Sequence, residues 1–210
     1  MSDLSTGPST LVIDFGDLPS LVCGFLESDP TRAVLWHRRG AGVAGARRVA
    51  LLEENAVALG VERTVFTDPL PAAFAERPEL VEAIDLLEAC TAAESLGCHR
   101  VVWPLVCGPD PTLLANAVER SCLAALLAAS TPDVPRVVVE IPVADLADAA
   151  IADLAEDLNI PPRLFWPCTS DAAGRTSPCG TCQECRRWRG AFSEARVEWP
   201  WAGAPAAVTV

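Results

Sequence analysis

Short apolar runs alternate along the chain with longer segments whose apolar residues recur every three or four positions. The runs are rich in Val, Ile, Leu and aromatic residues, which is typical of buried β-strands. They predict strands at residues 11–15, 33–36, 63–67, 100–103 and 136–140. The longer segments predict helices at residues 18–27, 43–59, 79–96, 112–129, 145–158 and 183–195.

This alternation predicts an α/β fold with a Rossmann-like parallel sheet of about five strands and helices on both faces, because strands that are apolar throughout must be covered on both sides. Residues 1–160 would form that body, residues 161–196 a cysteine-bearing loop and helix, and residues 197–210 an apolar tail. Ligands bind such sheets at the carboxyl ends of the strands. The loops expected there are 14–20, 36–42, 67–78 and 104–109.

Composition excludes several classes of function. The 210 residues carry a net charge of -12, and all 16 basic residues are Arg. Without Lys there is no Schiff-base chemistry, and the acidic field opposes binding to nucleic acid. No 18-residue apolar run predicts a membrane span, and the polar N-terminus does not look like a signal peptide. Five of the nine Cys stand singly in apolar segments, which favours a reducing cytoplasm.

Four cysteines near the C-terminus form the most distinctive motif. Cys179, Cys182 and Cys185 follow a C-x2-C-x2-C spacing, and Cys168 lies eleven residues before the first of them. Short C-x2-C steps let a tight turn present two sulfurs to one ion, so the motif predicts a structural zinc site with four thiolate ligands. Disulfides or an iron–sulfur cluster are the alternatives. A zinc ion held by four sulfurs has no open position for catalysis.

Several short motifs, taken in order, resemble one family. They are Ala46 to Ala50, Leu59 to Glu62, Ile141 to Leu146, Leu158 to Pro161, Trp166-Pro167-Cys168, and Cys179-Gly180-Thr181-Cys182-Gln183-Glu184-Cys185. Over residues 11–193 the chain resembles 7-cyano-7-deazaguanine synthases of the PP-loop ATP pyrophosphatase group. The cysteine motif is the specific part of the resemblance.

The resemblance implies an ATP-dependent enzyme with a structural zinc. Such enzymes convert 7-carboxy-7-deazaguanine and ammonia to the nitrile, which feeds queuosine-type modification. Members are commonly homodimers, so a second copy and a deazapurine-type small molecule are the expected partners. The family binds ATP at a Ser-Gly-Gly-x-Asp-Ser turn after the first strand. The corresponding residues here are Asp14, Gly16, Asp17 and Ser20.

That turn departs from the family pattern. Asp14 places a carboxylate where the family has a hydroxyl, Phe15 replaces a glycine, and Pro19 lacks an N–H donor. The same Asp and Ser residues also suit helix capping or a cation site. Two hypotheses therefore stay open. One is an active ligase, and the other is a non-catalytic zinc-binding relative that binds a ligand, a partner or an active paralogue.

No catalytic residue is assigned by the sequence. His37 follows the second strand on the ligand-facing side, where a satisfied or solvated histidine is expected. Tryptophans at positions 36, 166, 188, 199 and 201 are expected in the core or at a subunit interface, and one of them could stack on a purine-like base.

Overall fold

The computed structural model describes residues 8–27, 29–40, 42–74, 77–129, 137–170 and 177–201. Its strands are β1 (Thr10–Ile13), β2 (Ala33–Arg38), β3 (Arg63–Thr67), β4 (Arg100–Val102) and β5 (Val138–Glu140). Its helices are α1 (Leu18–Phe25), α2 (Gly42–Leu59), α3 (Pro78–Leu96), α4 (Pro111–Ala128), α5 (Asp148–Asp157) and α6 (Gln183–Ala195). Three short 3-10 helices are η1 (Pro30–Arg32), η2 (Ala72–Phe74) and η3 (Pro162–Leu164).

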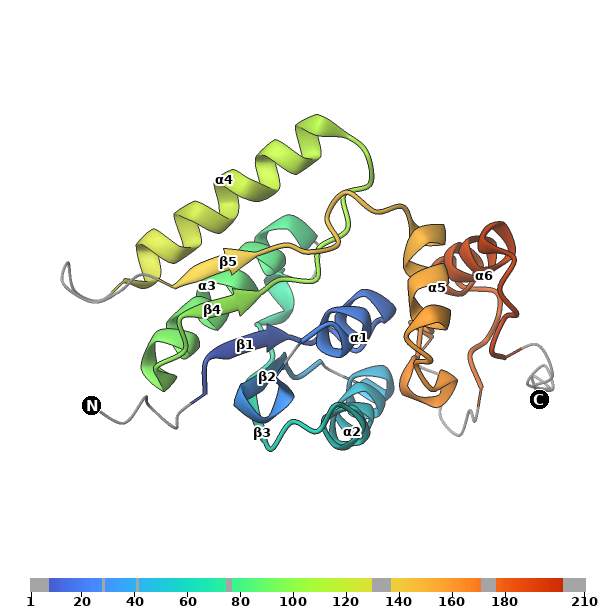
Figure 1. Cartoon of the computed structure of the whole chain (residues 1–210), viewed down its shortest axis with the longest axis horizontal. Helices are drawn as coiled ribbons and strands as arrows, with labels where there is room; N and C mark the ends of the chain where they lie inside the picture. The colour runs from blue at the N-terminus through green and yellow to red at the C-terminus, as the bar shows by residue number, and fades with distance from the viewer. Residues whose placement is uncertain are drawn as a thin grey trace.

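The five strands form one parallel sheet in the order β3-β2-β1-β4-β5 (Figure 1). The chain builds outward from β1 through β2 to β3, then returns through α3 to β4 on the other side of β1. The strand order therefore reverses between β1 and β4, which is where open α/β sheets form a ligand crevice. The predicted α/β fold with a five-stranded parallel sheet is confirmed.

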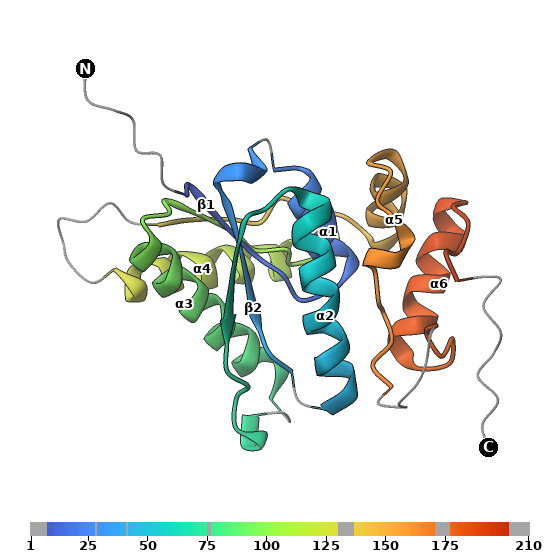
Figure 2. The ribbon, with the colours of Figure 1, turned by 90° about the horizontal axis from the view of Figure 1, so that it is seen from below.

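Two apolar layers cover the sheet because successive strand residues point to opposite faces. On β1, Val12 packs with α1, α2, α5 and α6, whereas Leu11 and Ile13 pack with α3 and α4. Figures 1 and 2 show α1 and α2 on one side of the sheet and α3 and α4 on the other. The first layer contains Phe165 and Trp188 as well as Val12, so the segment after residue 160 shares a core with the body.

Helix ends follow the capping residues that stand in the sequence. Asp110 caps α4 by accepting hydrogen bonds from the backbone N–H groups of Thr112 and Leu113 at 2.8 and 3.3 Å. Gly97 ends α3 with φ +76°, a left-handed conformation that glycine adopts without strain. Among the described residues, every helix is too short or too polar to cross a lipid bilayer.

Several predicted boundaries differ from the structure. β1 ends at Ile13 instead of position 15, and β2 continues to Arg38 because it pairs with β3 up to Thr67. Helix α5 begins at Asp148 instead of Asp145, because the backbone N–H groups of Ala144 and Leu146 bond three residues back in tight turns. Position 136, the predicted start of the fifth strand, and tail residues 202–210 lie outside the described residues.

Candidate functional site

A cavity of about 580 Å³ lies at the carboxyl ends of the strands, beside the point where the strand order reverses. Residues from the ends of β1, β2 and β4 form part of its wall, and α2, α3 and α6 complete it. The wall includes the aromatic side chains of Phe15, Trp103 and Trp188. It also includes four guanidinium groups, those of Arg38, Arg39, Arg48 and Arg187. The cavity therefore has the location, size and mixed polarity of a small-molecule site.

The turn after β1 brings together the four predicted nucleotide-binding residues. Asp14 Oδ1 accepts a hydrogen bond from the Gly16 N–H at 2.6 Å. Asp17 Oδ1 accepts from the Ser20 N–H at 3.0 Å and from the Ser20 hydroxyl at 2.5 Å. Ser20 Oγ in turn accepts from the Phe15 N–H at 3.0 Å. Of the four, Asp17 lines the cavity, whereas Asp14 and Ser20 are buried.

These bonds occupy the groups that a phosphate would use. A phosphate-binding turn presents free backbone N–H donors to the anion, often at a helix N-terminus. Here the N–H groups of Phe15, Gly16 and Ser20 already bond to oxygens of the chain itself. Pro19 has no N–H. The start of α1 is therefore closed by its own carboxylates and hydroxyl.

Burial determines how the two carboxyl groups titrate. It raises the pKa of Asp14, although the hydrogen bond from the Gly16 N–H and the nearby His37 ring act in the opposite direction. Burial also raises the pKa of Asp17, against hydrogen bonds from Ser20 and the charge of Arg48. Both side chains are costly to ionise, and neither forms an ion pair with another described residue.

His37 lies near the carboxyl end of β2 and lines the cavity. The residue is buried, with 3% of its surface exposed, and Nδ1 lies 2.5 Å from the carbonyl oxygen of Asp14. Because a carbonyl oxygen only accepts, Nδ1 must carry the proton. The other ring nitrogen, Nε2, is buried and has no hydrogen-bond partner among the described residues. We expected the His37 side chain to be hydrogen-bonded or exposed to solvent. The structure shows it buried, with a hydrogen bond at only one of its two ring nitrogens among the described residues.

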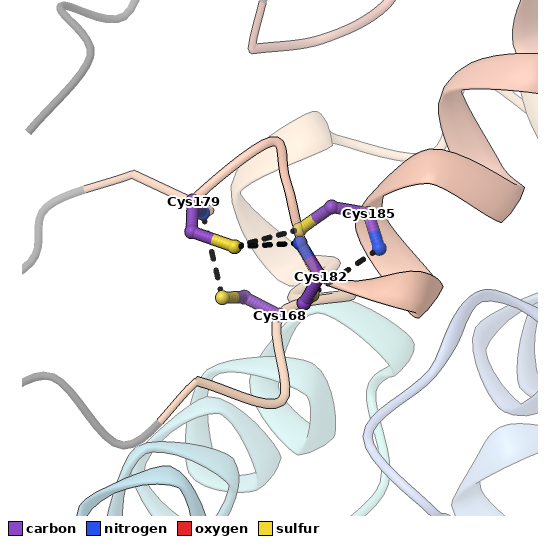
Figure 3. A group of neighbouring side chains, drawn as sticks. All are labelled: Cys168, Cys179, Cys182 and Cys185. Atoms are coloured by element: carbon purple, nitrogen blue, oxygen red, sulfur yellow. Dashed lines mark hydrogen bonds between the residues drawn. The ribbon is translucent and has the colours of Figure 1, made fainter.

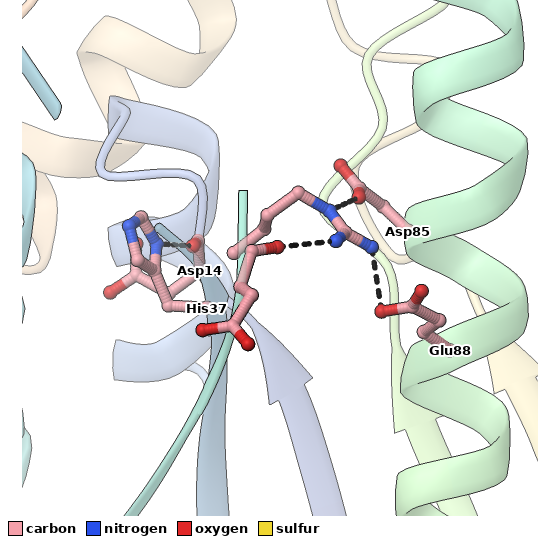
Figure 4. Close-up of polar contacts among 6 residues, drawn as sticks. Asp14, His37, Asp85 and Glu88 are labelled. Carbon is pink, nitrogen blue, oxygen red and sulfur yellow. Dashed lines mark hydrogen bonds and ion pairs between the residues drawn. The ribbon is translucent and has the colours of Figure 1, made fainter. Parts of the chain in front are cut away.

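Arg38, the next residue, connects β2 to α3 through an ion-pair network that the sequence did not predict (Figure 4). Its guanidinium binds the Asp85 carboxylate, Glu88 Oε2 at 2.7 Å, and the backbone oxygen of Asp68 at 2.8 Å. Burial raises the pKa of Asp85, while Arg38 opposes this shift. Because the Arg38 guanidinium is bound by these three groups, it stabilises the cavity wall and is not available to bind a ligand.

Arg48 differs from Arg38 because it has no carboxylate partner within hydrogen-bond distance in the described part of the chain. Its Nε is buried without a hydrogen-bond partner, and its side chain packs against Gly16. A Cβ at Gly16 would lie 3.2 Å from Arg48 Cγ, and Gly16 has a φ of +70° that favours glycine. Among the described residues of the wall, Arg48 is therefore a cationic side chain that can meet an anionic or acceptor group.

The four predicted cysteines form one compact cluster (Figure 3). The sulfur atoms of Cys168, Cys179, Cys182 and Cys185 all lie within 4.8 Å of one another. The Cys179 and Cys185 sulfurs are 3.9 Å apart, close to the separation of about 3.8 Å expected for sulfurs 2.3 Å from a tetrahedral zinc ion. The cluster can hold a metal ion, and the donor set fits one with a preference for thiolate.

Backbone and hydroxyl donors surround the sulfurs as they would surround thiolates. Cys179 Sγ accepts from the N–H groups of Cys182 and Thr181 at 3.2 and 3.4 Å, and Cys168 Sγ accepts from the Cys179 N–H at 3.4 Å. Burial works to raise the pKa of Cys179, but these bonds and that of the Thr181 hydroxyl outweigh it and lower the pKa to about 6. A low pKa favours the thiolate form that binds metals.

The cysteine cluster is connected to the cavity through α6. Cys182 caps the helix by accepting a hydrogen bond from the Cys185 N–H at 3.5 Å. One turn further on, Glu184, Arg187 and Trp188 line the cavity. Arg187 also binds Asp148 at the start of α5 through two contacts of 2.6 Å. The cluster therefore fixes the end of the helix that closes the cavity.

Comparison with known proteins supports the predicted resemblance. Residues 116–196 match the family model described as Queuosine biosynthesis protein QueC. A 61-residue segment is 38% identical to 7-cyano-7-deazaguanine synthase of Cyanothece sp. (strain PCC 7425 / ATCC 29141). Both matches support the suspected family over part of the chain.

Both matches cover only part of the chain. The 61-residue match covers 28% of this chain and 27% of the length of the 7-cyano-7-deazaguanine synthase. The family-model match includes the four cysteines and α6, but the turn after β1 lies outside it. The activity and substrate of the 7-cyano-7-deazaguanine synthase can therefore only be proposed for this chain.

Most residues of the cavity wall were not predicted from the sequence as site residues. Trp103 and Arg48 contribute to it from β4 and α2, and Glu184 and Arg187 contribute from α6. The position of Trp103 at the end of a predicted strand was an available signal. Arg48 lies within the Ala46 to Ala50 motif, but its position inside a predicted helix did not place it at the cavity.

Proposed function

We propose that this protein is a zinc-binding relative of 7-cyano-7-deazaguanine synthase that binds a deazapurine-type small molecule without performing the ATP-dependent step. The observation that carries the proposal is the closed turn after β1. Asp14 and Asp17 bond to the N–H groups of Gly16 and Ser20, which a bound phosphate would otherwise accept from.

Binding ATP there would require these bonds to break. Each buried group left without a partner costs about 1–3 kcal/mol. A carboxylate that stayed in the turn would also repel the triphosphate, since like charges in a buried site are unfavourable. The turn therefore disfavours ATP binding for two reasons. Its N–H donors are already hydrogen-bonded, and its carboxylates would repel the phosphates.

The remaining cavity suits a flat, polar ring system. Phe15, Trp103 and Trp188 offer aromatic surface. Among the described residues, Arg48 Nε is a donor without a partner, and Nε2 of a neutral His37 is an acceptor without one. A deazapurine carrying a carboxylate has an acceptor for the first, and its ring N–H groups are donors for the second.

Zinc is the metal proposed for the four cysteines, in a structural role. Four thiolates complete its coordination and leave no position for a substrate. A reducing compartment such as the cytoplasm would keep these cysteines and the five other thiols reduced.

An active ATP-dependent ligase is the alternative. It is favoured by Arg48, whose guanidinium lies beside the turn and would match a phosphate. This reading requires Asp14 to release the Gly16 N–H when ATP binds. It predicts AMP formation from ATP, 7-carboxy-7-deazaguanine and ammonia.

Isothermal titration calorimetry separates the two readings. We expect 7-carboxy-7-deazaguanine to bind the zinc-loaded protein and ATP with Mg²⁺ to give no heat of binding. Heat from ATP would refute the closed-turn argument. No binding of 7-carboxy-7-deazaguanine would refute the proposed ligand.

Two adjacent arginines provide a matched pair for the same titration. Arg48→Gln should weaken binding of 7-carboxy-7-deazaguanine by tenfold or more, since hydrogen bonds to charged groups are worth about 1.5–3 kcal/mol. Arg47→Gln removes the same charge, but Arg47 is exposed and stacks on Trp166 outside the cavity. That variant should bind as the wild type does. Equal losses in both variants would mean that net charge alone matters.

A further inference from the structure

A second cavity, with a volume of about 380 Å³, is lined by residues from the end of α5, from η3, from α6 and from the segment after α6. Figures 1 and 2 both show α5 and α6 side by side. Leu18 of α1 also lines this second cavity, whereas its neighbours Asp17 and Pro19 line the first. The two cavities share no lining residue. The volume of the second cavity suits a small molecule.

Three aromatic rings form one wall of the second cavity. The Trp199 ring is nearly perpendicular to both phenylalanine rings, with centroids 5.4 Å from Phe192 at 81° and 6.3 Å from Phe165 at 89°. The two phenylalanine rings stack with their centroids 6.2 Å apart. Perpendicular rings that line one cavity form a corner, and the negative faces of aromatic rings attract cations. This corner is called the aromatic corner below.

The charged side chains around the aromatic corner are both acidic. Glu156 and Glu198 line the second cavity and are exposed, and neither forms an ion pair with another described residue. Pro161, Pro162 and Pro200 complete this part of the lining and have no N–H groups to offer an anion. No Arg stands among the lining residues that the structure describes. The second cavity therefore has the charge that complements a cation.

Other aromatic rings of this protein already have a cation of the chain over them. In the described part of the chain, five rings have an Arg guanidinium 5.0 to 5.7 Å from their centroids. These rings are Trp36, Phe66, Trp103, Trp166 and Trp188. Among the described residues, no guanidinium lies over the three rings of the aromatic corner. The aromatic corner is thus left for a cation from outside the chain.

We propose that the second cavity binds a small organic cation, an ammonium ion whose nitrogen carries apolar substituents. The substituents match the aromatic corner, and the charge matches Glu156 and Glu198. The net charge of -12 also raises the local concentration of cations. A metal ion is a poorer occupant, because hard cations require about six oxygen ligands. An anion would meet two carboxylates and no basic side chain among the described lining residues.

Choline is the probe for this site. Its neutral control is the alcohol of the same shape in which a tert-butyl group replaces the trimethylammonium group. Proton NMR of the zinc-loaded full chain should show the choline methyl signal moving upfield, because protons over aromatic faces are shielded. We expect a dissociation constant of about 1 mM or lower, and binding of the alcohol about tenfold weaker or more. An unshifted choline signal, or equal binding of the alcohol, would overturn the proposal. The first cavity takes no part, so the result does not depend on the proposed function.

Two tryptophans two positions apart provide matched variants. Trp199→Leu removes a ring of the aromatic corner and should weaken choline binding by about threefold to thirtyfold. Trp201→Leu makes the same change outside the second cavity, where Trp201 packs on Trp166, and should leave binding unchanged. Circular dichroism checks the fold, and Trp199→Phe, which keeps a ring, should retain most of the binding. Unchanged binding in Trp199→Leu, equal losses in both leucine variants, or loss of binding in a folded Trp199→Phe would contradict the proposal.

Two glutamates separate the local charge from the net charge. Glu198→Gln removes a carboxylate of the second cavity and should weaken choline binding by about twofold to fivefold, as for an exposed ion pair. Glu194→Gln removes the same charge from an exposed position of α6 outside the cavity and should leave binding unchanged. Both variants are compared with the wild type in the same NMR titration. Equal losses would show that net charge alone attracts choline, which would overturn the assignment of the site.

Discussion

At the scale of single residues, Asp14 has the largest effect on what this site can bind. Its carboxylate accepts the Gly16 N–H, its backbone oxygen accepts from His37, and its second carboxylate oxygen lies 3.4 Å from Asn55 Nδ2. Asp14 thus closes the turn after β1 through its side chain, and its backbone oxygen takes part in fixing the tautomer of the buried histidine.

The pH dependence of stability tests this role. Burial raises the pKa of Asp14 above its usual value of 3.8, so the folded protein holds this proton more tightly than the unfolded chain. Its contribution to stability is then present at low pH and is lost as pH rises from about 4 through the folded pKa. Asp14→Asn keeps an oxygen for the Gly16 N–H and removes the titration. We expect its free energy of unfolding in urea to fall less with rising pH than that of the wild type.

Asp110→Asn is the control for that series, because Asp110 is an exposed helix cap. Parallel profiles for Asp14→Asn and the wild type would contradict the burial argument.

At the scale of elements, the loop after β2 packs closely against the start of α2 through the backbones of Gly40 and Gly45. A Cβ at Gly45 would lie 2.2 Å from the Gly40 carbonyl oxygen. Gly40 lines the cavity, so this contact fixes part of its rim. We expect Gly45→Ala to cost about 2–3 kcal/mol of stability, since backbone atoms cannot move aside cheaply.

Gly190 in α6 is the matched control. A Cβ there would meet nothing within 4 Å. Gly190→Ala should stabilise the protein by about 0.5–1 kcal/mol, because alanine has the higher helix propensity. Urea denaturation measures both variants, and a Gly45→Ala protein as stable as the wild type would refute the contact.

The cysteine cluster and α6 should act as one unit. Metal analysis is expected to return about one zinc ion per chain, lost in Cys182→Ser and retained in Cys122→Ser, whose cysteine is exposed on α4. Loss of the ion should also weaken binding of 7-carboxy-7-deazaguanine, because Glu184, Arg187 and Trp188 line the cavity from α6. A folded wild-type protein without metal, or unchanged binding in Cys182→Ser, would contradict this account.

Sequence pattern predicted the elements well because strand and helix periodicities are local. The runs at β3 and α6 were predicted to the residue, and the C-x2-C-x2-C spacing located the cysteine cluster. The start of α5 was missed because tight turns there satisfy the backbone without a helix. Closure of the turn after β1 depends on the direction in which Asp14 and Asp17 point, which residue types alone do not determine.

At the scale of the whole molecule, an excess of acidic groups opposes compaction. With 28 acidic and 16 basic residues, self-repulsion should lower stability at low ionic strength. Salt screens repulsion between exposed charges, whose range is about 10 Å at 0.1 M. We expect the midpoint of thermal unfolding, measured at low micromolar concentration, to rise by a few degrees between 0.02 and about 0.5 M NaCl. A falling midpoint would mean that attractive ion pairs such as Arg38–Asp85 dominate.

The most direct test of the central claim is AMP formation. Zinc-loaded protein is incubated with ATP, Mg²⁺, 7-carboxy-7-deazaguanine and ammonia, and the quenched mixture is separated by chromatography. The closed turn after β1 predicts no AMP above the level of a protein-free control. Formation of AMP together with the nitrile, in proportion to protein concentration, would contradict it.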